Sequence, residues 1–156
     1  MQNTLSLFLI IAVLATSCHK TQQEPTAYIN TFSANVNGVT FVPASIEVLF
    51  GGSSVPGARQ VNIYAKNANG HEITLILLNY DGQIKTFTQT IGAYTIPPGG
   101  LNNSSYSTSG EIKISSIDKI SFKYGEVVTG TFQFGTDATV GTYSVTSGNF
   151  SVFVKQ

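Results

Sequence analysis

The sequence contains few of the residues that mark several protein classes. It has one cysteine, no tryptophan and five prolines against fifteen glycines in 156 residues, which excludes a disulfide scaffold and a collagen-like repeat. Charged residues make up only 10%, and eight Lys and Arg balance eight Asp and Glu, so the formal net charge is zero. Nucleic-acid binding requires a basic face that displaces counterions from phosphates. We therefore expect no nucleic-acid partner, and the chain length fits one ordinary domain.

The N-terminus contains the longest apolar run of the chain. Residues Leu5–Ala15 include one polar residue, Ser6. A membrane-spanning helix needs about 20 apolar residues, so this run is too short to span and has the length of the hydrophobic region of a signal peptide. Small residues follow directly after it, and they precede Cys18, the single cysteine.

Small residues ahead of a lone cysteine resemble the lipobox of bacterial lipoproteins. The resemblance implies that residues 1–17 are a signal peptide that is removed, that the Cys18 sulfur is lipidated and that the new N-terminus is acylated. Several acyl chains form a stable membrane anchor, because each buried methylene contributes about 0.8 kcal/mol. An ordinary secretion signal that leaves Cys18 as a free thiol is the alternative. After the lipidated cysteine, the polar residues up to 27 form a tether that reaches at most about 30 Å.

The remainder of the chain has the composition of a β-protein. From Cys18 onward, 40 of 139 residues are Ser, Thr or Asn, which favour strands and turns over helices. Apolar and polar residues alternate with a period of two between glycine-containing turns, as in residues 61–65. About nine or ten short strands with frequent turns predict an antiparallel β-sandwich over residues 28–156. A closed, lipocalin-like β-barrel is the alternative.

Turn signals separate the expected strands. Asn37-Gly38 predicts a tight hairpin, because both residues tolerate the positive φ that such a turn requires. The other turns are expected at residues 67–70, 81–82 and 147–148, and polar loops at residues 51–57 and 97–109. Strand patterns occur at residues 32–36, 39–42, 46–50, 61–65, 73–78, 112–116, 128–134, 142–146 and 150–154, and weaker ones at residues 84–89 and 91–96. Phe122 and Tyr124 precede the pattern at 128–134.

One expected strand is apolar on both faces. Ile73, Leu75 and Leu77 share one face, and Ile76 and Leu78 lie on the other with a threonine. Strands that are buried on both faces read as nearly continuous apolar runs. We therefore expect a central strand whose outer side is covered by the loop of residues 97–109, or else forms a partner surface.

Three segments resemble one group of lipoproteins. Residues 32–38 (Phe-Ser-Ala-Asn-Val-Asn-Gly), with Phe41 after them, resemble the start of the globular part in uncharacterised lipoproteins of the Bacteroidetes type. Residues 130–134 and 145–151 resemble the closing strands of the same group. The likeness covers about residues 30–154 and implies a β-sandwich domain in the bacterial cell envelope. It also implies anchoring to the outer membrane, on its periplasmic or its surface side, and it assigns no functional residues.

Patterns for catalysis and metal binding are weak. Residues 52–57 have the glycine spacing of a phosphate loop, but the lysine and the following helix are missing. Asn67, Asn69, His71 and Glu72 cluster at one turn, where a calcium loop would need more carboxylates and left-handed asparagines are the simpler interpretation. His71 is the one credible general base, so a hydrolase using His71 with Glu72 or a strand-end serine is an alternative. We expect no enzyme activity, no cofactor and no metal site.

The best binding candidate is the loop of residues 97–109, which is long for a compact domain. Tyrosine rings stack on sugars or peptides, and Asn and Ser side chains supply hydrogen bonds. We expect a non-enzymatic binding or structural role towards a glycan, a peptide or a partner protein. A carrier of lipid or small ligands in a barrel interior is an alternative, and so is a plain surface loop with its tyrosines packed over the core. The candidate ligand-binding residues are Tyr80, Tyr94, Asn102, Asn103 and Tyr106.

Overall fold

A computed structural model describes residues 28–88, 91–121 and 125–155 of the chain. The expected signal peptide, the expected lipidation site Cys18 and the expected tether lie outside the described residues, and so do Phe122 and Tyr124. Within the described ranges, no helix has both the length and the apolarity that crossing a membrane requires.

Almost all of the described chain is antiparallel β-structure, which confirms the all-β prediction. A single turn of 3-10 helix, η1 (Leu101–Asn103), stands between two of the strands. The strands are β1 (Thr31–Val36), β2 (Val39–Phe41), β3 (Pro43–Gly51), β4 (Arg59–Asn67), β5 (Glu72–Tyr80), β6 (Thr86–Phe87), β7 (Gly92–Thr95), β8 (Ser104–Ser121), β9 (Gly125–Thr136) and β10 (Ser144–Val154).

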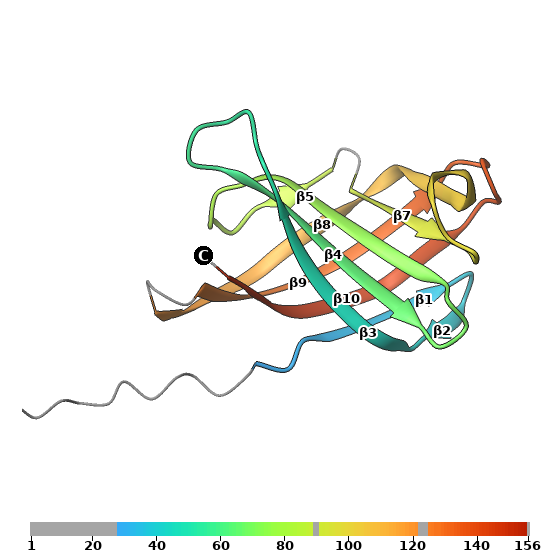
Figure 1. The fold of residues 1–156 in the computed structure, drawn as a ribbon, viewed down its shortest axis with the longest axis horizontal. Helices are drawn as coiled ribbons and strands as arrows, with labels where there is room; N and C mark the ends of the chain where they lie inside the picture. The colour runs from blue at the N-terminus through green and yellow to red at the C-terminus, as the bar shows by residue number, and fades with distance from the viewer. Residues whose placement is uncertain (1–27, 89–90, 122–124, 156) are drawn as a thin grey trace, which may run out of the picture.

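The strands form one sheet that is nearly closed into a barrel (Figure 1). Their order in the sheet is β2-β1-β10-β9-β8-β7-β5-β4-β3, and β6 pairs separately with β8. The long strand β8 belongs to both halves, because Ser104–Tyr106 pair with β7 whereas residues from Ser107 onward pair with β9. The architecture therefore fits both a sandwich whose halves share a strand and a barrel.

One continuous segment links the two edges of this sheet. β2 pairs with β1, and after Val42 the chain runs directly into β3, which pairs with β4. The β3–β4 register shifts between Pro43 and Ser45, where the chain changes partner. Further along, β3 approaches β1 and β10, but no main-chain hydrogen bond joins it to them within the described residues. The barrel is thus closed at the β2–β3 junction and open along the rest of β3.

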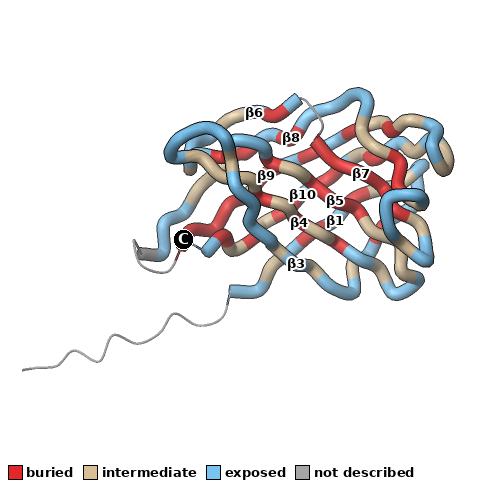
Figure 2. Tube along the Cα trace, turned by 45° about the horizontal axis from the view of Figure 1, so that its top comes forward, coloured by how far each residue is buried: buried red, intermediate tan, exposed pale blue. Residues whose placement is uncertain are grey.

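Inward and outward side chains alternate along the strands. Val61, Ile63 and Ala65 of β4 are at most 1% exposed, and the residues between them face outward. Figure 2 shows the result as buried segments that alternate with half-buried and exposed ones along the strands. Full burial of an aliphatic side chain contributes about 1.5–3 kcal/mol, so this alternation fixes which face of each strand points inward.

Aromatic rings fill the half of the interior next to β1, β9 and β10. The Phe132 ring centroid lies 5.0 Å from that of Phe32, 6.4 Å from Phe150 and 6.5 Å from Phe134. Gly148 makes room for this cluster, because a Cβ atom there would lie 2.5 Å from the Phe132 ring. The interior of the barrel is therefore occupied by side chains.

The predicted turn at residues 147–148 is wrong. Ser147 and Gly148 lie inside β10, where Ser147 has a φ of 52° and the register with β9 shifts between Val145 and Gly148. This geometry is a β-bulge, in which one strand accommodates an extra residue and bends. Residues 142–146 and 150–154, expected as separate strands, are consequently joined in one long strand that begins at Ser144.

The predicted loop at residues 97–109 is too long. It ends at Asn103, and the Ser- and Thr-rich residues from Ser104 onward belong to β8. They are strand residues because β7 and β9 supply main-chain partners. The weakly patterned segments nearby are shorter than expected, since β6 covers only Thr86–Phe87 and β7 only Gly92–Thr95.

The prediction of a central strand with a covered outer face concerns β5. This strand lies between β4 and β7, which confirms its central position. On its outer face Thr74 is buried and Ile76 half-buried, but Leu78 is 39% exposed. The covering is thus limited to the part of β5 that faces residues 97–103.

Candidate ligand-binding groove

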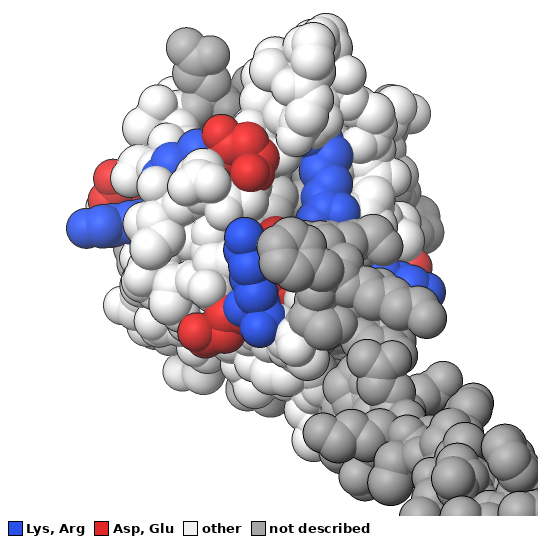
Figure 3. Space-filling view, turned by 90° about the vertical axis from the view of Figure 1, so that its left-hand side faces the viewer, with Lys and Arg blue, Asp and Glu red and all other residues white. Residues whose placement is uncertain are grey.

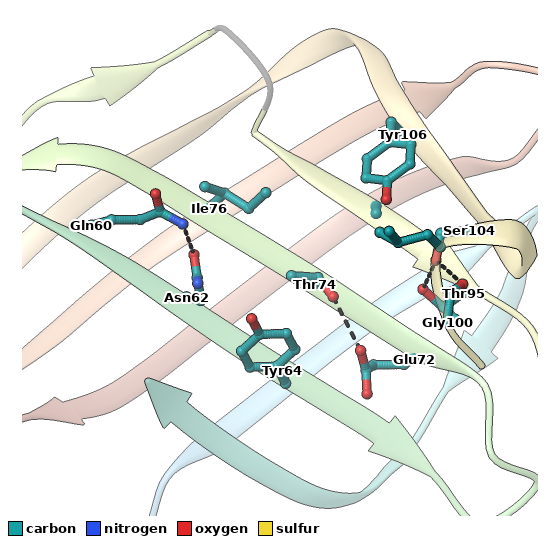
Figure 4. Close-up of a pocket in the computed structure, with 12 residues that line it drawn as sticks. Gln60, Asn62, Tyr64, Glu72, Thr74, Ile76, Thr95, Gly100, Ser104 and Tyr106 are labelled. Carbon is teal, nitrogen blue, oxygen red and sulfur yellow. Dashed lines mark hydrogen bonds between the residues drawn. The ribbon is translucent and has the colours of Figure 1, made fainter. Parts of the chain in front are cut away.

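A groove of about 360 Å³ runs over the outer face of β4, β5 and β7 and the start of β8 (Figure 4). Each strand contributes the side chains that its period of two directs away from the core. From β4 these are Gln60, Asn62 and Tyr64, which alternate with the buried residues. The volume lies at the lower end of the range typical of small-molecule sites.

The pairing register explains why the surface is hollow at this place. Tyr64 lies opposite Thr74, Thr74 opposite Ala93, and Ala93 opposite Tyr106. One row across four strands therefore has a large ring at each end and two small side chains between them. Three strand spacings of about 4.8 Å separate the two tyrosines, which gives about 14 Å between their Cα atoms. The small residues form the floor and the tyrosines form the sides.

The loop of residues 97–103 closes one end of the groove with Gly100 and Leu101. Its conformation is held by its own polar groups. The Asn103 side-chain amide donates to the Gly99 carbonyl oxygen at 2.9 Å, and the Ser104 hydroxyl donates to the Gly100 carbonyl oxygen at 3.0 Å. The end wall is consequently a fixed part of the site.

Polar side chains of the groove are paired with one another. Gln60 Nε2 donates to Asn62 Oδ1 at 2.8 Å, and the Thr74 hydroxyl donates to Glu72 Oε1 at 3.2 Å. Figure 4 shows both pairs on the groove floor, with the two tyrosines on either side of Thr74. Neither tyrosine hydroxyl makes a hydrogen bond to the described part of the chain. These phenols and the unused amide atoms are available to a ligand.

The five predicted binding residues lie in different parts of the structure. Tyr106 lines the groove. Asn103 supports the loop that closes it, and Asn102 is exposed on the same loop without lining the groove. Tyr80 and Tyr94 are both buried away from it. Among the five, the structure therefore places Tyr106 in the groove and Asn103 next to it.

Tyr80 belongs to a polar cluster at the end of the barrel where the C-terminus lies (Figure 1). Its hydroxyl donates to Glu126 Oε1 at 2.7 Å, and the Arg59 guanidinium lies 3.7 Å from the same oxygen. Arg59 also donates to the Lys155 carbonyl oxygen at 2.8 Å, so it connects β4 with the end of β10. Burial, and then the bond to Glu126, raise the pKa of Tyr80. Glu126 is only 2% exposed, and these contacts satisfy a carboxylate that would be costly to bury alone.

Positive and negative side chains are mixed on the surface at that end of the barrel. Figure 3 shows blue and red groups next to one another on this face. Lys85 and Asp81 form an ion pair at 3.0 Å. The lysine holds the pKa of the Asp81 carboxyl below its ordinary value. Exposed pairs of this kind contribute little and do not mark a binding site.

Tyr94 packs inside a small aromatic cluster. Its ring centroid lies 4.4 Å from that of Tyr143 and 5.7 Å from the His71 ring, and its hydroxyl lies 2.8 Å from His71 Nδ1. Burial, and then Tyr143, raise the pKa of Tyr94. A tyrosine in this position supports the core and is not presented to a ligand.

The geometry around His71 does not assemble a hydrolase site. His71 contacts Tyr94, whereas its neighbour Glu72 bonds to Thr74 in the groove. Asn67 Oδ1 accepts the backbone N–H groups of Asn69 and His71, both at 3.0 Å. The prediction of left-handed asparagines in this turn is wrong, because the positive φ of 82° belongs to Gly70. Over the described ranges, no three His, Cys, Asp or Glu residues come together.

The opposite half of the sheet has smaller hollows without this arrangement. One of about 300 Å³ is lined mainly by Ser, Thr and Asn side chains of β1, β8, β9 and β10. Thr129 and Ser151 of its lining bond each other at 2.8 Å, and Ser151 also bonds to the Tyr28 hydroxyl at 2.6 Å. Because these hydroxyls are already paired within the protein, this hollow is a weaker candidate.

Sequence reasoning did not identify Gln60, Asn62, Tyr64 or Thr74. In a sequence, outward polar residues on a strand look like an ordinary solvated face. The hollow forms because the small residues Thr74 and Ala93 of β5 and β7 lie between the tyrosines of β4 and β8. The pairing register is therefore the signal that was needed. No family model, no curated protein and no solved structure matches this chain, so its function has to be inferred from this geometry.

Proposed function

We propose that this protein is a lipid-anchored protein of the bacterial cell envelope that binds a ligand in the groove without converting it. The observation that carries the proposal is the row from Tyr64 to Tyr106. It combines two phenols that have no hydrogen-bond partner among the described residues, a floor of small side chains and an end wall held by hydrogen bonds.

The described residues around the groove do not bring together a nucleophile, a general base and an acid, which supports binding over catalysis. Glu72, the one carboxylate that the described residues bring to the groove, has a threonine hydroxyl as partner, and His71 is engaged with Tyr94. General acid–base chemistry needs positioned groups that can exchange a proton with the substrate. Neighbouring hydroxyls and amides instead supply fixed hydrogen bonds, which hold a ligand in one orientation.

Filled packing of the barrel interior favours the outer surface as the binding site. Phe32, Phe132, Phe134 and Phe150 occupy the space that a carrier would need for its cargo. The Tyr94 cluster occupies another part of the molecule near Tyr143. A lipid or small-molecule carrier therefore has less support than a protein that binds on its outer face.

Membrane anchoring is supported by the sequence around Cys18. The single cysteine stands two residues beyond the one long apolar run, after Thr16 and Ser17, where lipidation would hold the domain on a short polar tether. A domain held close to a membrane meets polymers of the envelope at high local concentration. At such a concentration, a groove of low affinity still holds ligand in a large fraction of the molecules.

The test is hydroxyl-radical footprinting of the protein in intact cells and after purification. Tyr64 and Tyr106 are expected to be modified more slowly in the envelope than in the purified protein, because a ligand covers them. Tyr28, which is exposed on the opposite side of the sheet, serves as the internal control. Equal modification of Tyr64 and Tyr106 in both states would show that the groove is empty and would refute the proposal.

A further inference from the structure

The floor of the groove has no free main-chain edge. β5 pairs with β4 on one side and with β7 on the other, and β7 pairs with β8. Main-chain N–H and C=O groups of these strands are therefore used within the sheet. A peptide that binds by strand addition needs an exposed edge. A ligand of this groove must instead be recognised by side chains.

The charge of the groove excludes anionic ligands. Among the described residues that line it, Glu72 is the one that carries a charge. Lys66 lies opposite Glu72 in the β4–β5 register, but it is exposed and does not line the groove. Phosphate, sulfate and carboxylate ligands are normally held by arginine or lysine in paired geometry. Here such a ligand would meet a carboxylate and no lining cation.

Neutral hydrogen-bonding groups surround an apolar centre. The Gln60–Asn62 pair leaves the Gln60 carbonyl oxygen and the Asn62 amide hydrogens free, and the Tyr64 and Tyr106 hydroxyls add two groups that can donate and accept. The apolar side chains of Ile76 and Ala93 lie in the same groove, and Leu101 adds an apolar side chain at its end. This pattern complements a molecule with hydroxyls around its edge and C–H groups on its faces.

We propose that the groove recognises an uncharged saccharide. This inference rests on the proposed function and names the ligand class of the same groove. One sugar ring lies over Thr74 and Ala93 between the two tyrosines, its C–H face against the apolar centre. Its hydroxyls bond to the phenols and to the Gln60–Asn62 pair. A neighbouring unit of the chain extends from the open end of the groove, away from Leu101.

The experiment is a binding screen with the full mature protein in detergent. Its probes are neutral glucan, mannan, galactan and N-acetylglucosamine oligomers, uronic acid and sulfated oligomers, and neutral, acidic and basic peptides. A neutral oligosaccharide is expected to bind best. Tyr64→Ala and Tyr106→Ala are expected to weaken it about tenfold or more, and the exposed control Tyr28→Ala to leave it unchanged.

Two further variants test single properties of the groove: the Tyr106 hydroxyl apart from its ring, and the Glu72 charge apart from its side-chain shape. Tyr106→Phe retains the ring and is expected to weaken binding only a few-fold, with circular dichroism showing an unchanged fold. Glu72→Gln removes the charge and is expected to change neutral-saccharide binding by no more than a few-fold. A loss of more than about a hundredfold in Glu72→Gln would indicate a cationic ligand and overturn the inference.

The outcomes distinguish this inference from the proposed function. If an acidic saccharide or a peptide binds best and Tyr106→Ala abolishes that binding, the ligand class is wrong although the groove is a binding site. If a neutral saccharide binds equally well to the wild type and to both tyrosine-to-alanine variants, the site lies elsewhere and both proposals fail. Lack of binding by every probe, together with footprinting that finds the groove empty, also overturns both.

Discussion

At the scale of single residues, glycine decides how closely the strands of this barrel pack against aromatic rings. Gly148 lies against the Phe132 ring, and Gly130 lies against the Phe150 ring, where an added Cβ atom would approach within 2.7 Å. In each case the ring occupies the volume that a side chain would fill. The glycine in the β10 bulge thus allows the phenylalanine cluster to pack closely against the strand.

We predict that Gly148→Ala destabilises the protein by about 1–3 kcal/mol, because the methyl group must displace the buried Phe132 ring. Urea unfolding followed by circular dichroism measures the change. Gly52→Ala is the matched control, since no atom lies within 4 Å of the Cβ position at Gly52. Equal stability of both variants would show that the Phe132 ring does not need this space.

Tyr80 makes a pH-dependent contribution to folding. Because burial and Glu126 raise the pKa of its hydroxyl, the folded protein keeps this proton at a pH where the unfolded chain, with an ordinary pKa of about 10, releases it. Stability from this group is therefore fully present below about pH 10 and is lost as the pH rises above it. Tyr94, whose pKa is also raised, acts in the same direction.

We predict that the free energy of unfolding declines less steeply above about pH 10 in Tyr80→Phe than in the wild type, by up to about 1.4 kcal/mol per pH unit. At about pH 8 the same variant should be less stable by about 1–3 kcal/mol, since Glu126 loses its hydroxyl donor. Urea titrations from about pH 8 to about pH 11 measure both effects. Tyr28→Phe is the exposed control, and identical slopes in Tyr80→Phe and the wild type would contradict the prediction.

At the scale of elements, the loop of residues 97–103 shows how a candidate ligand-binding segment can be structural. Asn102 and Asn103 look alike in the sequence, but only the Asn103 side chain bonds to the loop backbone. Main-chain bonds from Ile96 to Asn103 and from Asn103 to Gly100 complete the loop. Its stiffness keeps Leu101 in place at the end of the groove.

We predict that Asn103→Ala increases hydrogen exchange in residues 96–104 about two- to tenfold, which corresponds to the loss of one net hydrogen bond of about 0.5–1.5 kcal/mol. Hydrogen–deuterium exchange with mass spectrometry measures it. Asn102→Ala, on the same turn of helix and exposed, should exchange like the wild type. Unchanged exchange in Asn103→Ala would mean that the main chain alone holds the loop.

The success of the sequence reasoning also differs between elements. Alternation places Ile63 and Ile73 in the core because a period of two leaves only one face to bury, and both are fully buried. Tyr80 and Tyr94 could not be assigned in this way, since a tyrosine suits both a core with a polar partner and a binding surface. The register across four strands, which places Tyr64 and Tyr106 on the same row, depends on strand order, and a single sequence does not encode strand order in any local pattern.

At the scale of the whole molecule, the anchor and the domain are expected to be independent. We predict that Cys18→Ser moves the protein from the membrane fraction to the soluble envelope fraction, because the variant lacks the sulfur that would carry the lipid. Fractionation with immunoblotting measures the location, and mass spectrometry of the wild type measures the lipid. The thermal unfolding midpoint should stay the same in both forms. A Cys18→Ser protein that remains in the membrane fraction would argue against the lipid anchor.

The β2–β3 junction has a consequence for how the protein behaves under proteolysis. Val42 is 69% exposed at the point where a single strand passes from one edge of the sheet to the other. Cleavage there would separate β2 from β3 and let the two edges of the sheet, which are already unpaired among the described residues, move apart and add strands from another molecule. The intact link at Val42 therefore keeps the two edges beside each other, where they are less open to strands of other molecules.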